Sequence, residues 1–357
     1  MTSLTVNQRA AAEGTLSSFE LFWRDRYDWL LSTGYQLRPR YKPDWTPSWK
    51  GTNKTRLQCE DGIPAAVRLF IRLSATGTQP PQTSRVLDAV KVEDGSFVVI
   101  KQVDKRRHPQ ESDIGQFLCS PPLSSDVRNH CYPILAVLDD PYDPDRQLMV
   151  MPLLRRFYQP KFASVGEAVE FFRQIFEVRV LHAPYCSCLI RVTSACNSCT
   201  STVLLTGWLR LPIHLEQCSL TYSDISRLNV MMDSRPILPQ TFHPQAPSMS
   251  RDLQRFVSPS SRTAHPVNYY ITDFGLSRRY RLDEANPLEE PIMGGDKTVP
   301  EFQHDPITPR NPFPTDVYYM GNLVRENFLQ VSFSFAPMFN NSNCFCRFIR
   351  TSVSWNR

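Results

Sequence analysis

The sequence predicts an α+β fold, because both strand-like and helix-like patterns of apolar residues occur along the chain. Its 357 residues correspond to roughly two domains and can bury a sizeable core. Strand-like patterns of apolar residues gather in the first part, at residues 87–92, 97–101, 131–138 and 148–154. The clearest helical pattern opens the second part, directly after Ser164.

The amino-terminal region, residues 15–50, joins an aromatic, helix-like stretch to a loop that contains arginine, proline and tryptophan. We interpret residues 1–73 as a docking extension that is not a domain of its own. Residues 74–85 are mostly Ser, Thr, Gln, Pro and Gly, which is the composition of a linker.

Two local signals place the elements that follow the linker. Asp94-Gly95 separates the first two strand patterns and is typical of a tight hairpin turn. Glu111 opens a short helical pattern whose apolar residues share one face. The sequence therefore predicts a hairpin followed by a short helix.

The helix after Ser164 has Glu167 three residues beyond its cap, and its buried face is expected to end at Glu177. Residues 178–212 then mix Cys, Thr, Ser and isolated apolar residues with neither a helical nor a strand period, which is typical of an insert. A second irregular stretch, residues 236–266, is rich in proline.

Composition excludes several classes of protein. Forty Lys plus Arg against 35 Asp plus Glu give a net charge of +5 that is spread along the chain, so we expect no nucleic-acid partner. No apolar run reaches the roughly 18 residues that a membrane span needs, and the first residues carry no secretory signal. We expect a cytoplasmic or nuclear protein that is not secreted and does not bind membranes.

Three short strings occur in an order that matters more than any one of them. They are Val98-Val99-Ile100-Lys101 on a strand, Asp224-Ile225-Ser226-Arg227-Leu228-Asn229 in a loop, and Asp273-Phe274-Gly275 after a strand. Together they resemble the motifs of the protein kinase superfamily.

The resemblance implies a two-lobed protein kinase-like fold with a small β-rich N-lobe and a mainly helical C-lobe. The N-lobe would span residues 74–155 and the C-lobe residues 156–330. The insert at residues 178–212 would interrupt the C-lobe. The atypical tail, residues 331–357, lacks the further helices of that fold, so the C-lobe looks truncated.

The resemblance also implies an activity and its residues. The chain would be an ATP- and Mg²⁺-dependent kinase that transfers the γ-phosphate to a protein hydroxyl, with the serine/threonine type favoured. Lys101 and Glu111 would position the nucleotide phosphates, and Asp224 would act as the catalytic base. Asn229 and Asp273 would hold Mg²⁺. The protein substrate stays unknown.

Further segments resemble the family. Residues 148–154 resemble the strand that leads to the hinge, residues 297–301 resemble the Ala-Pro-Glu end of an activation segment, and residues 316–321 resemble the start of the buried helix that follows. Residues 22–27 and 294–301 are similar to a fungal kinase-like branch.

Three departures from the family bear on activity. Residues 74–90 contain only Gly77 where a glycine-rich loop precedes the lysine strand, which predicts weak nucleotide binding. Tyr222-Ser223 replaces the His-Arg of the catalytic loop, so activation-loop phosphorylation is not the expected switch. Ser226 stands where serine/threonine kinases usually carry a lysine that meets the transferred phosphate. Only Arg227 is near enough in sequence to replace that lysine.

Each motif also has a simple structural reading. An isolated Asp273-Phe274-Gly275 is mostly a turn, Lys101 a snorkelling surface lysine and Glu111 a capping residue. At the level of function, the first alternative is a weak or inactive pseudokinase that binds partners through the amino-terminal extension. The second alternative is a small-molecule kinase.

The insert has two alternative readings. Cys186, Cys188, Cys196 and Cys199 with His182 would supply the ligands of a zinc knuckle, although their spacing matches no standard pattern. The alternative is retained intron sequence, since the family likeness stops both after Glu177 and after Gln330.

Overall fold

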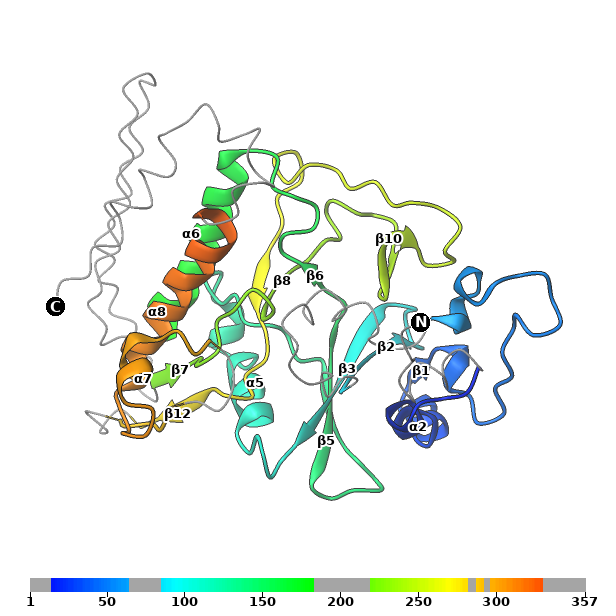
Figure 1. Ribbon diagram of the computed structural model, residues 1–357, viewed down its shortest axis with the longest axis horizontal. Coiled ribbons are helices and arrows are strands. Elements are labelled where there is room, and N and C mark those ends of the chain that lie inside the picture. The colour runs from blue at the N-terminus through cyan, green and yellow to red at the C-terminus, as the bar shows by residue number, and fades with distance from the viewer. Residues whose placement is uncertain (1–13, 64–84, 183–218, 282–286, 292–295, 330–357) are drawn as a thin grey trace, which may run out of the picture. The chain divides into compact units, whose positions relative to one another are not determined.

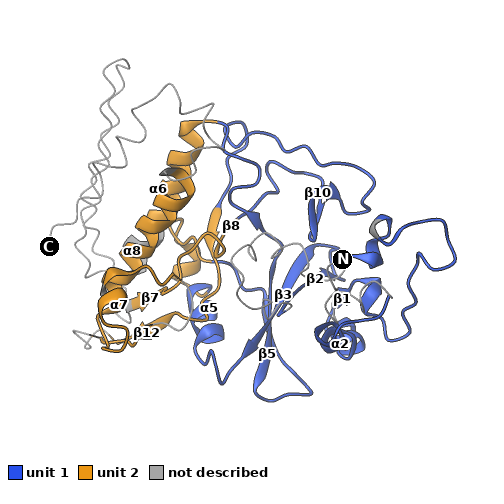
Figure 2. Cartoon of the chain, viewed as in Figure 1, with its two compact units in different colours: residues 1–119, 132–163, 232–268 blue, residues 120–131, 164–231, 269–357 orange. Residues whose placement is uncertain are grey.

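The structure is a computed structural model that describes residues 14–63, 85–182, 219–281, 287–291 and 296–329. The chain divides into two compact units (Figure 2). Unit 1 comprises residues 1–119, 132–163 and 232–268, and unit 2 comprises residues 120–131, 164–231 and 269–357. Both units contain helices and strands, so the α+β class is confirmed.

Unit 1 is built on a five-stranded antiparallel sheet with the order β1-β2-β3-β5-β4 (Figure 1). Its strands are β1 (Tyr35–Leu37), β2 (Val86–Lys91), β3 (Phe97–Asp104), β4 (Ala136–Asp139) and β5 (Arg146–Pro152). The remaining elements of unit 1 are α2 (Ser18–Arg24), α3 (Tyr27–Ser32), η1 (Pro39–Tyr41), η2 (Arg56–Gln58), η3 (Glu60–Gly62), α5 (Glu111–Leu118), β6 (Arg155–Arg156), β9 (Phe242–His243) and β10 (Ala246–Ser250). The central strand of the sheet is β3.

The predicted hairpin is confirmed as β2 and β3. Gly95 has a φ of +69°, a backbone conformation that glycine adopts without steric cost. The Gly95 N–H donates to the Lys91 carbonyl at 2.9 Å, and the Ser96 N–H donates to Asp94 Oδ1 at 2.9 Å. The alternation of buried residues along β3 then sets Val98 and Ile100 into the core.

The strand predicted at residues 131–138 is shorter than expected. Strand β4 begins only at Ala136, and Cys131 forms a single isolated bridge with Ile271. Pro133 lies between them and has no N–H to donate to a ladder, which accounts for the interruption.

The amino-terminal region predicted as a docking extension packs into the core of unit 1. Trp23 of α2 and Tyr27 and Leu30 of α3 are all buried in one cluster with sheet residues such as Leu87. Strand β1 pairs antiparallel with β2 and extends the sheet. Residues 15–50 therefore stabilise the sheet.

The stretch at residues 236–266, predicted as irregular, contains the antiparallel pair β9 and β10 and belongs to unit 1. Buried arginines connect this stretch to residues 155–157. Arg155 donates to the Pro247 carbonyl at 2.6 Å, and Arg262 donates to the Phe157 carbonyl at 2.7 Å. Such contacts between distant segments leave no local pattern in the sequence.

Unit 2 contains long helices and short strand pairs (Figure 1). Its elements are η5 (Leu123–Ser125), α6 (Val165–His182), β7 (Ser219–Thr221), β8 (Val230–Met232, whose last residue is counted in unit 1), β11 (Tyr269–Ile271), β12 (Arg278–Tyr280), α7 (Pro300–His304), α8 (Pro312–Val324) and the π-helical turn η6 (Arg325–Leu329). Strands β7 and β12 pair antiparallel, and β8 neighbours β11.

The predicted cap of α6 is confirmed, because the Glu167 N–H donates to Ser164 Oγ at 3.2 Å. The helix itself continues past Glu177 to His182, so the first residues of the stretch predicted as an irregular insert, 178–182, are helical. Adding a residue to an existing helix is much easier than starting one, so a helix can run past the end of its apolar pattern.

Two predictions lie outside the described residues. The structure does not describe residues 183–218, which include most of the predicted insert. The four cysteines of the zinc-knuckle reading lie in this segment. The tail from residue 330 onward also lies outside the described residues. Among the described helices, none combines the length and apolarity needed to cross a membrane.

Candidate active site

Lys101 and Glu111 form a buried ion pair within unit 1. Lys101 lies on the central strand β3, opposite Val86 of β2 and Met149 of β5. Its Nζ donates to Oε1 of Glu111, the first residue of α5. The side chain of Glu111 is 1% exposed and that of Lys101 is 15% exposed. The structure therefore brings together the two residues predicted to position phosphates.

The surroundings of this pair differ from the simple reading of Lys101 as a surface lysine. A snorkelling lysine would extend its ammonium into water, whereas Lys101 directs it at a buried carboxylate. A buried charge needs a partner because its loss of hydration is costly. Glu111 also starts a helix, where the helix dipole favours a negative charge.

Asp224 and Asn229 form a closed loop in unit 2. Asn229 Nδ2 donates to the carboxylate of Asp224 at 2.8 Å and to its carbonyl at 3.0 Å. The Asn229 N–H donates to the Ser226 carbonyl at 3.0 Å. Asp224 is partly exposed, while Asn229 is 8% exposed. The amide thus orients the predicted base.

Asp316 holds the two residues that precede Asp224, the predicted base. Its carboxylate accepts the N–H groups of Tyr222 at 2.8 Å and Ser223 at 2.7 Å, and it lies on α8 with 3% exposure. The sequence placed Asp316 at the start of a buried helix but gave it no role in the site. A carboxylate among apolar helix residues was the available signal, because a buried carboxylate requires donors.

Asp273 has a left-handed backbone, with a φ of +67°. Its Oδ1 accepts the Gly275 N–H at 3.2 Å, and the following Phe274 is buried. The preceding Thr272 donates its N–H to the Asn229 carbonyl at 2.8 Å, which ties the segment of Asp273 to the end of the Asp224 loop.

Backbone strain is concentrated at these loops. Of the three non-glycine residues with positive φ in the described part of the chain, Ser223 directly precedes Asp224 and Asp273 is a predicted metal ligand, while Leu253 lies in unit 1. Such conformations cost on the order of 1–3 kcal/mol each and gather at functional sites. Strain at one predicted residue, Asp273, and at the immediate neighbour of another, Asp224, favours a functional role over an ordinary turn.

The donor set of this region fits Mg²⁺. Because the Asn229 amide nitrogen faces Asp224, the carbonyl oxygen of its side chain is the atom that can meet a cation. Asp273 adds a carboxylate, and Mg²⁺ prefers oxygen ligands and is typically held by one or two protein groups together with phosphates. No cluster of three or more His, Cys, Asp or Glu side chains suited to a metal occurs among the described residues.

The segment predicted to resemble the end of an activation segment rests on α8. Tyr318 donates its hydroxyl to the Thr298 carbonyl at 2.8 Å, and the Asn322 amide donates to Asp296. Val299 is 1% exposed. The side chain of Glu301, which the sequence analysis left without a partner, lies outside the described part of the structure.

The five predicted residues thus form two groups, each assembled within one unit. Lys101 and Glu111 belong to unit 1, and Asp224, Asn229 and Asp273 belong to unit 2. No protein-family model matches the chain, and no curated protein matches its sequence. The resemblance to protein kinases therefore rests on the sequence motifs and stays a prediction.

Proposed function

We propose that the chain is an ATP- and Mg²⁺-dependent phosphotransferase with a two-lobed, protein kinase-like fold, which transfers the γ-phosphate to a protein hydroxyl. The observation that carries the proposal is the loop in which Asn229 orients Asp224 while Asp316 holds the two preceding N–H groups. A side chain that serves only as a turn residue does not need this support.

In this proposal Lys101 holds the nucleotide phosphates and Glu111 fixes the position of the lysine ammonium. Asp224 orients the acceptor hydroxyl and accepts its proton, since a partly exposed carboxylate held by an amide can receive a hydrogen bond in a fixed direction. Asn229 and Asp273 would hold Mg²⁺, which neutralises negative charge on the phosphates when bound.

A pseudokinase that acts as a binding module is the second candidate. The observation that favours it is the long connection between β1 and β2, where the described part, residues 38–63, contains only Gly51 and Gly62. A glycine-rich phosphate cover is not expected from such a composition. One contact argues against the pseudokinase that binds partners through its amino-terminal extension. The indole Nε1 of Trp45 in that extension donates to Asp61 at 2.9 Å, so this side chain is engaged within unit 1.

The test compares three aspartate variants of the full chain. Asp224→Asn should lower transfer of radiolabelled phosphate to a generic protein acceptor by about 100-fold or more with nearly unchanged Mg·ATP affinity, because the base acts mainly in the transition state. Asp273→Asn should weaken both transfer and affinity.

Asp252→Asn is the matched control, since Asp252 is an exposed turn residue that precedes the positive-φ residue Leu253. Its transfer rate and nucleotide affinity should equal those of the wild type. Equal transfer by all four proteins, or a rise in unfolding temperature with Mg·ATP in none of them, would contradict the proposal.

A further inference from the structure

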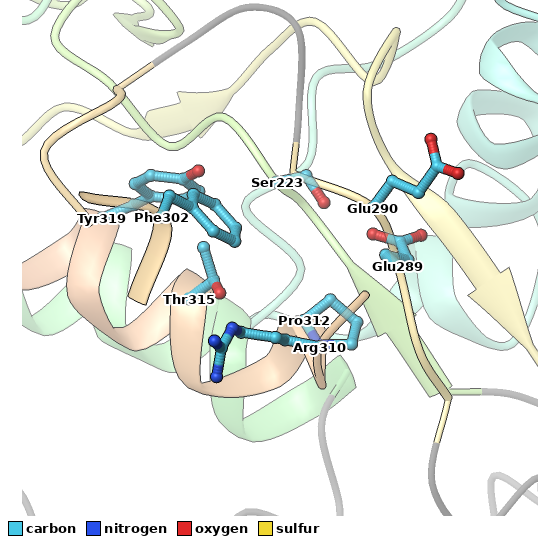
Figure 3. Close-up of a pocket in the computed structure, with 8 residues that line it drawn as sticks. All are labelled: Ser223, Glu289, Glu290, Phe302, Arg310, Pro312, Thr315 and Tyr319. Atoms are coloured by element: carbon cyan, nitrogen blue, oxygen red, sulfur yellow. The ribbon is translucent and has the colours of Figure 1, made fainter. Parts of the chain in front are cut away.

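Two groups of buried polar atoms bear on the proposed function. The first lines a pocket in unit 2 that adjoins Ser223 (Figure 3), where Arg310 Nε and the Tyr319 hydroxyl have no hydrogen-bond partner among the described residues. Figure 3 also shows the carboxylates of Glu289 and Glu290 around this pocket. A lining with groups of both charges selects neither a cationic nor an anionic ligand.

The second group lies in unit 1, on the face of the sheet that carries Lys101. In the pairing of β2 with β3, Val86 lies opposite Lys101 and Asp88 lies opposite Val99. Opposite residues share a face of the sheet, and so do residues two positions apart on one strand, so Asp88, Val99 and Phe97 share the face of Lys101. In the proposed function the nucleotide lies against this face, because Lys101 holds its phosphates.

A segment from later in the chain docks on the same face. We call residues 242–251, which comprise β9, β10 and Arg251, the strap. Gln245 Nε2 of the strap donates to Asp88 Oδ1 at 3.5 Å, and the guanidinium carbon of Arg251 lies 3.6 Å from the centre of the Phe97 ring. The strap therefore contacts both β2 and β3 on the side of Lys101.

These contacts cover only one end of the face. Asp88 is 4% exposed, and Arg155 holds the middle of the strap through the Pro247 carbonyl at 2.6 Å. Val99 is half-buried, and Val86, opposite Lys101, is 42% exposed. The docked strap thus occupies the part of the face that adjoins the lysine.

The layer between the strap and the sheet is short of hydrogen bonds. Arg38 Nη1, His243 Nε2 and Arg251 Nη1 are buried nitrogens with no hydrogen-bond partner in the described part of the chain. Two carboxylates lie only at ion-pair distance, Asp88 at 3.9 Å from Arg38 Nη1 and Glu60 at 3.6 Å from His243 Nε2. Because unmade hydrogen bonds of buried groups are destabilising, the docked strap is held less firmly than a fully bonded contact.

We propose that the strap is an autoinhibitory element, which lifts from β2 and β3 before a nucleotide can lie against the face of Lys101. This inference rests on the phosphotransferase function proposed above, and it adds a regulation of the same site. A weakly held segment opens at low cost, and a nucleotide that binds only the open state shifts the population toward it.

Opening can be measured without any nucleotide. Val99→Cys places a thiol between the two contacts of the strap, and its alkylation by iodoacetamide can be followed by mass spectrometry of the peptide that contains position 99. Adding Arg251→Glu brings a third carboxylate toward Asp88 and Glu60, which are the carboxylates that act on the charge of Arg251. Their repulsion should lift the strap and accelerate alkylation about fivefold or more.

Two further variants control this result. Arg255→Glu makes the same change of charge at an exposed position just beyond the strap, and it should leave the alkylation rate as it is in Val99→Cys alone. Gln245→Ala removes the contact with Asp88 at a half-buried position without changing the charge. It should accelerate alkylation about twofold, even if Arg251→Glu does not fold.

The affinity for Mg·ATP is then measured in the same variants with Val99 retained. Arg251→Glu should bind about fivefold and Gln245→Ala about twofold more tightly than the wild type, because closure of the strap no longer opposes binding. Arg255→Glu should bind like the wild type.

The two measurements separate the two proposals. Faster alkylation in Arg251→Glu and Gln245→Ala, without Mg·ATP binding to any of the proteins, would support the strap as a movable cover and overturn the phosphotransferase. Unchanged alkylation in both variants would overturn the strap alone. Faster alkylation with equal or weaker Mg·ATP binding would show that the strap does not compete with the nucleotide, which would also overturn the inference.

Discussion

Units 1 and 2 provide examples of two kinds of buried polar contact. In unit 1, charged side chains from separate segments pair with one another, as in Arg26 with Asp140 at 2.7 Å, Arg40 with Glu20 at 2.6 Å, and Lys101 with Glu111. In unit 2, polar side chains accept backbone N–H groups, as in Asp316 with Tyr222 and Ser223, and Gln174 with Tyr269 at 2.9 Å.

The difference concerns what each contact fixes. A pair of side chains fixes the distance between two elements whose backbones are already regular, such as β3 and α5. A side chain that accepts consecutive N–H groups fixes the backbone itself, which is what a loop with positive φ requires. The stability that comes from paired side chains should therefore change with pH and with substitution of both partners. The stability that comes from a side chain bonded to backbone N–H groups should change when that acceptor is removed.

The largest effect is expected from Asp316→Ala in unit 2. Two buried N–H groups, at Tyr222 and Ser223, would lose their acceptors, and at about 1–3 kcal/mol each the loop should be destabilised by about 4 kcal/mol. Amide hydrogen exchange at these two residues should accelerate accordingly, and phosphate transfer should fall with it.

Asp305→Ala is the matched control for that experiment. Asp305 also accepts two N–H groups, from Ile307 at 3.2 Å and Thr308 at 3.1 Å, but its side chain is 37% exposed. Water can replace this acceptor, so the loss of stability should be much smaller than in Asp316→Ala. Equal losses in the two variants would remove the proposed distinction between buried and exposed anchors.

The second effect tests the ion pair of unit 1. Lys101→Met leaves Glu111 buried without its cation and should lower the free energy of unfolding by about 3 kcal/mol, as measured by urea titration. Replacing both residues, Lys101→Met with Glu111→Leu, should restore most of that loss, because no unpaired charge remains.

Lys91→Met provides the surface control. Lys91 pairs with Glu93 at 2.5 Å, but the two side chains are 33% and 77% exposed, so we expect little or no change in the free energy of unfolding. A double variant at Lys101 and Glu111 that is less stable than the single one would show that the pair contributes more than mutual neutralisation.

The third effect is acid sensitivity in unit 1. Burial alone would raise the pKa of Glu60, but the neighbouring His243 and Arg38, the latter at 2.5 Å, outweigh it and lower the pKa to about 2. A depressed carboxylate pKa stabilises the fold above the unfolded value of 4.5, and this stability is lost as pH falls from there toward about 2.

After allowance for the 30% exposure of Glu60, the loss should be about 2 kcal/mol. It can be measured as the fall in the free energy of unfolding between about pH 5, just above the unfolded pKa of Glu60, and about pH 2, near its folded pKa. Glu60→Gln should flatten this part of the profile. An unchanged slope in the variant would assign the acid sensitivity to other carboxylates.

The sequence predicted the features that depend on neighbouring residues or on the order of motifs. The β2–β3 hairpin followed from Asp94-Gly95, the cap of α6 from Ser164, and the five site residues from ordered motifs. The function of those five residues stays a prediction, although their contacts support it.

The sequence did not predict the features that depend on distant segments. Nothing local to Asp316 names the backbone groups of Tyr222 and Ser223 as its partners. The packing of residues 15–50 into the sheet likewise needed the pairing of β1 with β2, which joins segments far apart in the chain. Serine and aspartate occur in many backbone conformations, so their identity alone cannot reveal a positive φ.

The smallest effect tests that positive φ directly. Ser223 has a φ of +54°, where a Cβ costs roughly 1–2 kcal/mol and glycine none. The informative quantity is the stability of Ser223→Gly minus that of Ser223→Ala, since both variants lose the hydroxyl and only one loses the Cβ. Glycine should be the more stable by about 1 kcal/mol, because relief of strain exceeds its extra entropy in the unfolded chain.

Two positions calibrate this comparison. Leu253, with a φ of +61°, should also favour glycine over alanine, although it lies in unit 1 and outside the proposed site. Ser277 is buried in unit 2 without a positive φ, and there alanine should be more stable than glycine by about 0.5–1 kcal/mol. If Ser223 behaved like Ser277, the loop before Asp224 would hold no backbone strain, and Asp316 would anchor a relaxed turn. If it behaves like Leu253, the two N–H contacts of Asp316 are what keep a strained backbone in place beside the proposed base.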